Sequence, residues 1–369
     1  MENFKRLDSL DALRGFDMLF IMGLSSLIVA ICNLFPGGSD WWIVGQMGHV
    51  SWNGFAHHDT IFPLFLFIAG VSFPFSYAKQ CSLGSGKGRI YRKIFLRAII
   101  LFLLGLVYNG LFKFEWSSLR FCSVLARIGF AWMFAALLFI NFKPGARAVI
   151  AAVILLGYWF LCMIPAPDVP GADPLTKEGC LVGYVDRILL GPDHLYSSRM
   201  FDPEGVLSTL PAIVTAMLGM FTGELVRLPE EKLSGNRKTL YMLGAAAVMI
   251  AVCLVWKQWF PVNKKLWTST FVLAAGGYSL IMFALFYWLI DVKGWRKWTF
   301  PFRVIGMNSI TIYLAPRIIN FRSATEFFTN GITAGMSEQA GKIVFYAVYL
   351  ILSWLFLYFL YRKKVFLKV

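Results

Sequence analysis

Residues 49–70 read HVSWNGFAHHDTIFPLFLFIAG, in which three histidines and an acid lead directly into an apolar run. The run continues toward residue 78, which gives about 20 residues, the length that a helix needs to cross the hydrocarbon core of a bilayer. Imidazole side chains exchange protons near neutral pH, and they can also accept an acyl group. The stretch therefore predicts a membrane-spanning helix with a reactive polar segment at its beginning.

Similar apolar runs recur along the 369 residues, of which 58% are hydrophobic and only 15% are charged. Soluble domains carry roughly 25% charged residues, so this composition is typical of an integral membrane protein. We predict an all-α, polytopic membrane protein whose residues 1–369 form a single transmembrane domain. The runs that we assign to about ten transmembrane helices lie near residues 12–31, 59–78, 94–112, 123–141, 147–164, 206–226, 239–258, 269–290, 299–316 and 342–361.

The formal net charge of +15 is distributed unevenly along the chain. Most of the 35 basic residues fall in segments that share one side of the membrane if the N-terminus is cytoplasmic. An excess of Lys and Arg is typical of cytoplasmic loops, and an even number of spans returns the C-terminus to the same side. We therefore expect both termini in the cytoplasm, contacts between the basic residues and the lipid bilayer, and no nucleic-acid partner.

Several familiar kinds of site have no signature in the sequence. The six cysteines lack a CxxC pair or the spacing of metal ligands, so neither a disulfide framework nor a metal site is expected. The motifs of nucleotide hydrolysis and of zinc proteases are missing as well. The first apolar run is too long for a signal peptide and lacks a small-residue cleavage site, so we expect it to remain as the first helix.

His49 is the leading candidate for a catalytic residue. It precedes Asp59 by ten residues, and an acid at that distance could orient the imidazole or accept its proton. Trp52 and Asn53 belong to the turn between them and are candidates for substrate binding. A histidine beside a tryptophan at the membrane interface is also common without any catalytic role, and the spacing alone leaves this reading open.

Charged residues within predicted spans are costly and are usually functional. Arg14 and Asp17 lie at the start of the first span. Arg127 lies inside the fourth span, and a phosphate or another anion would be a suitable partner for this arginine. An ion pair between Arg127 and Asp17 is the structural alternative. Lys264 and Lys265 could equally be ordinary interface charges. The remaining candidates for substrate binding are His194, Asp202, Glu204, Lys265 and Asn308.

Seven motifs of the chain also occur, in the same order, in one known family. They are SLDALRGFDM from Ser9, HVSWNGFAHHDTIFPLFLFIAG from His49, SVLARIG around Arg127, GPDHLY from Gly191, FDPEGVLSTLPAIVTAMLG from Phe201, NKKLWTSTFVL from Asn263 and GMNSI from Gly306. With these motifs, which cover most of its length, the chain resembles the family of the lysosomal heparan-α-glucosaminide N-acetyltransferase and its bacterial relatives. The LDALRG element is shared with the broader membrane acyltransferases that modify surface polysaccharides.

The resemblance implies a transferase that moves acetyl from cytoplasmic acetyl-CoA to the amine of a terminal glucosamine, or of a related amino sugar or oligosaccharide such as one from heparan sulfate, on the other side of the membrane. It implies that His49 is the catalytic histidine and Asp59 the aspartate that follows it. It also implies a homodimer. The chain departs from the family at Ser25, where the lysosomal enzyme has an asparagine that is thought to assist the histidine. Whether the acetyl group rests on the histidine stays open.

The resemblance also bears on cofactor binding and on location. The phosphates of CoA need cations, for which Arg14, Arg97 and Arg127 are the candidates. We expect Arg14, Asp17 and Arg127 at the cofactor site, with the two arginines ahead of the loop lysines. The compact chain predicts a bacterial inner (plasma) membrane. Two other functions stay open: an O-acetyltransferase acting on a surface glycan, and a transporter of sugars or lipid-linked glycans. In the transporter, Asp17, Arg127 and Arg303 would line the pathway.

Overall fold

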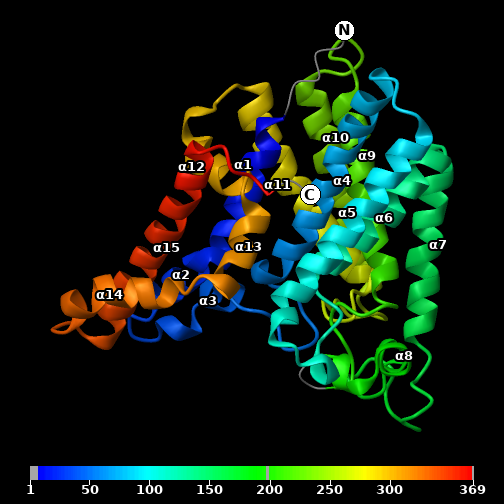
Figure 1. Cartoon of the computed structure of the whole chain (residues 1–369). Coiled ribbons are helices and arrows are strands. Elements are labelled where there is room, and N and C mark those ends of the chain that lie inside the picture. The colour runs from blue at the N-terminus through cyan, green and yellow to red at the C-terminus, as the bar shows by residue number, and fades with distance from the viewer. Residues whose placement is uncertain (1–6, 197–198, 368–369) are drawn as a thin grey trace.

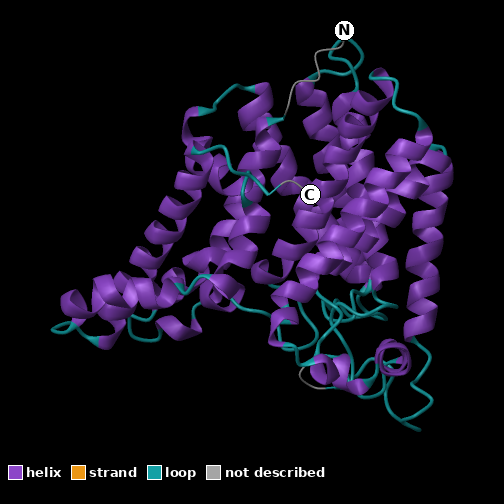
Figure 2. Cartoon of the chain, viewed as in Figure 1, coloured by secondary structure: helices purple, strands orange, loops and turns teal. Residues whose placement is uncertain are grey.

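The computed structural model describes residues 7–196 and 199–367, and within these ranges the chain forms helices and loops without a strand (Figure 2). The all-α fold predicted from the apolar runs is therefore confirmed. The α-helices are α1 (Asp8–Leu19), α2 (Ser25–Cys32), α3 (Trp42–Gln46), α4 (His57–Ser82), α5 (Lys87–Tyr108), α6 (Val124–Asn141), α7 (Pro144–Cys162), α8 (Leu181–Leu190), α9 (Thr209–Arg227), α10 (Gly235–Trp256), α11 (Ser269–Tyr287), α12 (Phe300–Gly306), α13 (Ser309–Ile318), α14 (Phe321–Thr333) and α15 (Glu338–Arg362).

Eight helical segments of the described chain are long and apolar enough to cross a membrane, which supports an integral membrane protein. The two other predicted spans differ from this set. Helix α5 has 22 residues, but basic residues occupy its first half. The run at 299–316 forms two short helices, α12 and α13, instead of one span. The break follows Gly306, whose backbone packs so tightly on α1 that a Cβ there would lie 1.9 Å from the Asp11 carbonyl oxygen.

The helices form two neighbouring groups (Figure 1). Helices α4 to α7 and α9 to α11 make the larger group, in which α4 packs along α9 and α10 along α11. The smaller group contains α1, α2 and α12 to α15, and α1 joins the two groups because it packs against both α12 and α11. The loop residues 109–123, 163–196 and 199–208, the second range with α8, lie together at the lower end of the bundle in Figure 1.

The first span is one continuous apolar segment with a kink in its middle. A π-helical turn, Phe20–Leu24, separates α1 from α2. Within it Gly23 adopts φ 126°, a left-handed conformation that glycine tolerates far better than other residues. A π-helical turn inserts extra backbone and changes the face to which the following residues point. The kink therefore sets the direction of Ser25, the first residue of α2.

Candidate active site

His49 and Asp59 meet at the beginning of α4. His49 lies in the loop after α3, and its Nδ1 is 2.8 Å from Oδ1 of Asp59 in the first helical turn. The second carboxylate oxygen of Asp59 accepts the backbone N–H of Val50 at 3.3 Å. Asp59 is buried, whereas the imidazole side chain of His49 is 54% exposed. The buried carboxylate thus fixes the orientation of a ring whose other edge stays accessible.

Lys264, from the loop between α10 and α11, completes this cluster. Its Nζ is 3.3 Å from Oδ1 of Asp59 and 3.1 Å from Nδ1 of His49. An ammonium has no acceptor, so Nζ and a protonated Nδ1 both donate to the carboxylate. In this arrangement Nε2 of His49 carries the lone pair and is free to act as a base or a nucleophile. Burial lowers the pKa of Lys264, while Asp59 opposes that change.

Neighbouring contacts hold the two loops of the cluster together. Lys265 donates to the Ser51 carbonyl at 2.6 Å. The side chain of Asn263 donates to Asn53 at 3.0 Å. Trp52 donates its indole N–H to the Leu175 carbonyl at 2.8 Å and packs edge-on against Phe201. Three residues predicted to bind substrate, Trp52, Asn53 and Lys265, thus contact protein loops in this structure.

A cavity of about 560 Å³ adjoins the cluster. His49, Lys264 and Glu204 line it near the loops, while Arg14, Ser72 and Arg97 line it deeper in the bundle. Both His58 and Ser72 of α4 contribute to its wall. These two residues are 14 positions apart, which corresponds to about 21 Å along a helix. The cavity therefore runs along much of the length of α4 and connects the histidine with two arginines.

The deep end of the cavity is cationic. Arg14 donates to Ser72 Oγ at 2.9 Å and pairs with Asp11 at 3.3 Å. The guanidinium of Arg97 stacks on the Trp132 ring at 4.1 Å, and its buried Nε has no hydrogen-bond partner among the described residues. Asp11 also lines this end, so its net charge is that of one cation, and the two guanidinium groups suit a ligand with several phosphates.

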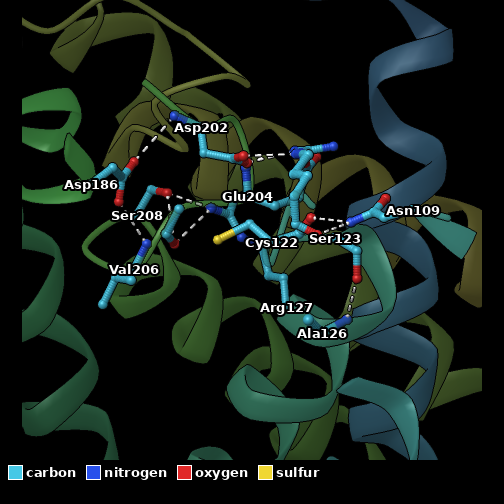
Figure 3. Close-up of polar contacts among 12 residues, drawn as sticks. Asn109, Cys122, Ser123, Ala126, Arg127, Asp186, Asp202, Glu204, Val206 and Ser208 are labelled. Atoms are coloured by element: carbon cyan, nitrogen blue, oxygen red, sulfur yellow. Dashed lines mark hydrogen bonds and ion pairs between the residues drawn. The ribbon is translucent and has the colours of Figure 1, made fainter. Parts of the chain in front are cut away.

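Arg127 lies elsewhere, in a network that anchors the loop at residues 202–206 (Figure 3). It donates to the Gly205 carbonyl at 3.2 Å and to the hydroxyl of Ser208. The described residues that line the cavity include neither Arg127 nor Asp17. Asp17 is buried within α1, and its Oδ2 has no hydrogen-bond partner in the described part of the chain. Of the three side chains predicted to hold a cofactor, the structure brings only Arg14 to the cavity.

Arg120, which the sequence did not single out, is the centre of the same network. It pairs with both oxygens of Asp202 at 2.7 and 2.5 Å and also contacts Glu204. Burial alone would lower the pKa of Arg120, but the two carboxylates raise it above its ordinary value. Asp186 accepts the backbone N–H groups of Asp202 and Val206 (Figure 3), and burial raises the pKa of Asp186 to about 7. The network presents Glu204 to the cavity, whereas Asp202 stays buried behind it.

The last two predicted substrate-binding residues lie away from the cavity wall. His194 stacks on Phe121 at 4.3 Å and donates from Nδ1 to the Leu119 carbonyl at 2.7 Å. Asn308 is buried at the break between α12 and α13. Its neighbours in sequence, Met307 and Ser309, do line the cavity.

Sequence reasoning gave Arg97 and Lys264 a low rank, and it did not foresee any contact of His58. The only sequence signal for Lys264 is its place in the motif from Asn263.

The described residues contain no group of three or more His, Cys, Asp or Glu side chains that could bind a metal ion. All six cysteines are free.

Comparison with known proteins identifies two relatives over almost the whole chain. The chain is 28% identical to heparan-alpha-glucosaminide N-acetyltransferase of Homo sapiens, in an alignment that covers 99% of this chain and 60% of that protein. It is 27% identical to the protein of the same name from Mus musculus, with 94% and 59% covered. The chain thus spans about 60% of the length of these relatives. No family model matches it.

Proposed function

Because the chain belongs to the family of heparan-alpha-glucosaminide N-acetyltransferases, we propose that it is a transmembrane N-acetyltransferase. Its donor is acetyl-CoA from the cytoplasm, and its acceptor is the amine of a terminal glucosamine or a related amino sugar on the opposite side. The protein would reside in a bacterial inner membrane. Helix α5 and the pair α12 and α13 would complete ten spans, which leaves both termini in the cytoplasm.

The observation that carries this proposal is the continuity of the cavity between Arg14 and Arg97 at one end and His49 at the other. The arginines would bind the phosphates of CoA, and the apolar wall between them and the histidine suits the uncharged pantetheine arm. A donor held in this way brings its thioester to the histidine while the nucleotide stays on the cytoplasmic side. The acceptor would arrive from the loops at the other end, where the carboxylate of Glu204 could pair with its ammonium group.

The chemistry assigned to His49 follows from its tautomer. Asp59 holds the proton on Nδ1, so that Nε2 can attack the acetyl carbon or take a proton from the acceptor nitrogen. In either case the bond from the acetyl carbon to sulfur breaks, a bond to the acceptor nitrogen forms, and the nitrogen gives up a proton. Asp59 and Lys264 keep the imidazole in place throughout. Trp52, Asn53 and Lys265 would support the acceptor site by holding its loops together.

Release of CoA from acetyl-CoA by the purified protein in detergent tests the proposal. We expect release that depends on added glucosamine and yields N-acetylglucosamine, which mass spectrometry identifies. The same donor offered with a sugar that has hydroxyl groups but no amine distinguishes the O-acetyltransferase. Uptake of sugar into proteoliposomes without any acetyl-CoA would instead support the transporter. Failure of acetyl-CoA to bind or react would contradict the proposal.

Replacement of Arg97 by glutamine should weaken donor binding selectively. Loss of one charge-assisted contact to phosphate costs about 1.5–3 kcal/mol, so we expect the KM for acetyl-CoA to rise by about 10- to 100-fold. Acetyl-pantetheine lacks the nucleotide phosphates, and its KM should be the same in both proteins. Arg92→Gln is the matched control, because Arg92 is exposed on the same helix and does not line the cavity. An equal effect on both donors would contradict a phosphate contact.

A further inference from the structure

His58 stands beside the proposed catalytic histidine, on the same cavity wall. The centroids of the two imidazole rings are 4.6 Å apart, and the rings meet edge to face at 65°. Nδ1 of His58 lies 3.3 Å from the hydroxyl oxygen of Ser25. Both histidines line the cavity that holds the proposed donor. The site therefore contains two imidazoles within reach of one substrate.

The adjacent His57 has different surroundings, although it is in the same helical turn. Its Nδ1 is 3.0 Å from the hydroxyl of Tyr278, its ring packs on Phe20, and its Nε2 is buried. Only His58 of this pair lines the cavity. The placement of the His58 ring thus depends on the kinked first span, because Ser25 follows the π-helical turn and contacts His58 on α4.

If the acetyl group rests on Nε2 of His49, the amine needs another proton acceptor while it attacks. One nitrogen of His49 is engaged with Asp59, so a single nitrogen is free. If Nε2 carries the acetyl group, it cannot also take the proton from the attacking amine. The nitrogen of an amine gains a positive charge when it bonds to the acetyl carbon, and it must then lose a proton to become a neutral amide. A second base at this position resolves the conflict.

We propose that His58 is this second base and that Ser25 is its positioning residue. The inference rests on the proposed acetyltransferase function and adds a residue to it. Nδ1–H of His58 donates to the Ser25 hydroxyl, which leaves a lone pair on Nε2. As the bond between the amine nitrogen and the acetyl carbon forms, the bond from that carbon to Nε2 of His49 breaks. The amine proton passes to Nε2 of His58, which then releases it to water on the acceptor side.

The charges around His58 are compatible with this role. The titratable groups that face it are His49 from the loop after α3, Lys264 from the loop before α11, and Asp59 and His57 on its own helix. Lys264 and Asp59 form an ion pair, so the carboxylate offsets part of the positive charge of Lys264 at His58. The described residues place no hydrogen-bond partner on Nε2 of His58. The lone pair is thus available to an acceptor in the cavity.

The rate of acetyl transfer to glucosamine as a function of pH tests this assignment. In wild type, kcat should fall at low pH as the second base becomes protonated. We expect His58→Ala to lower kcat by about 100-fold near pH 7, to remove that acidic limb and to leave the KM for acetyl-CoA unchanged. Added imidazole should restore part of the lost rate. Ser25→Ala should shift the pH at which the acidic limb occurs and should lower kcat less than His58→Ala does. Ser25→Thr should recover the wild-type pH profile.

His57→Gln is the matched control, because it removes the adjacent histidine that does not line the cavity. Thermal unfolding of each variant shows whether the protein remains folded. A kcat of His58→Ala within threefold of wild type from pH 6 to pH 9 would overturn the inference. An equal loss of kcat at every pH, without rescue by imidazole, would also overturn it, because that result indicates that His58 only packs against its neighbours. Absence of turnover in wild type would overturn the proposed function itself, so the two failures are distinguishable.

Discussion

Replacement of His49 by alanine is expected to lower acetyl transfer by at least about a thousandfold while the protein remains folded. The side chain is half exposed and contacts Asp59 and Lys264 at the end of the cavity, so its loss removes no part of the hydrophobic core. The accessible nitrogen that is proposed to react with the donor, Nε2 of His49, would be lost with it. CoA release measured with and without glucosamine gives the effect on kcat, and acetyl-CoA binding should stay within about twofold of wild type, since its phosphates bind at the other end.

Asp59 offers a second test of the same centre, because it acts through the histidine. Asp59→Asn should reduce kcat by about 100-fold or more, since an amide can present N–H instead of an acceptor to Nδ1. The double variant should be no slower than His49→Ala alone, because both changes disable one unit. A double variant that is slower by the product of the two single effects would show that the carboxylate works independently. Wild-type activity of His49→Ala would remove the histidine from the mechanism.

The pairing of His49 with Asp59 could be predicted because both residues border one helix. Asp59 lies in the first turn of α4, and a loop of this length returns His49 to that turn. Sequence spacing could not place Lys264 with them. That residue is more than 200 positions away, and only the packing of α11 against α4 brings its loop to the histidine.

Sequence position was also insufficient to decide which arginines line the cofactor cavity. Arg127 was favoured for the cofactor because it lies well inside an apolar run, whereas Arg97 lies near the basic start of its run. A run of apolar residues reveals that a helix is embedded but does not reveal which neighbour each face meets. In the structure, Arg127 contacts the loop at Gly205, and Arg97 lines the cavity. The network around Arg120 was missed because its partners Asp202 and Glu204 come from a distant loop.

The apolar runs gave a better account of the fold than of the site. Runs of about 20 residues correspond to helices because an embedded backbone must satisfy its hydrogen bonds internally. Interruptions within a run are harder to recognise. At the break after Gly306 the backbone packs tightly on α1, and at the kink Gly23 lies in ordinary contact with α15; neither contact has a local signature in the sequence.

Helices α4 and α9 should tolerate no added side chain where they cross. A Cβ on Gly219 would lie 2.0 Å from the Phe67 carbonyl oxygen, and one on Gly70 would lie 2.2 Å from the Ala216 carbonyl oxygen. Each clash is with backbone, so it can be relieved only if the helices separate. We expect Gly219→Ala to destabilise the protein by about 3 kcal/mol or more, because small residues allow helices in a membrane to approach closely.

Thermal unfolding in detergent, together with the fraction of monodisperse protein, measures this effect. Gly244→Ala is the matched control: Gly244 is inside α10, and a Cβ there would meet nothing within 4 Å. Alanine forms helix better than glycine, so the control should be as stable as wild type or slightly more so. Because α4 also carries His58 and Asp59, any Gly219→Ala protein that does fold should lose acetyl transfer as well. If Gly219→Ala left both the unfolding temperature and the rate of acetyl transfer unchanged, the close crossing of α4 and α9 would not be what holds the site together.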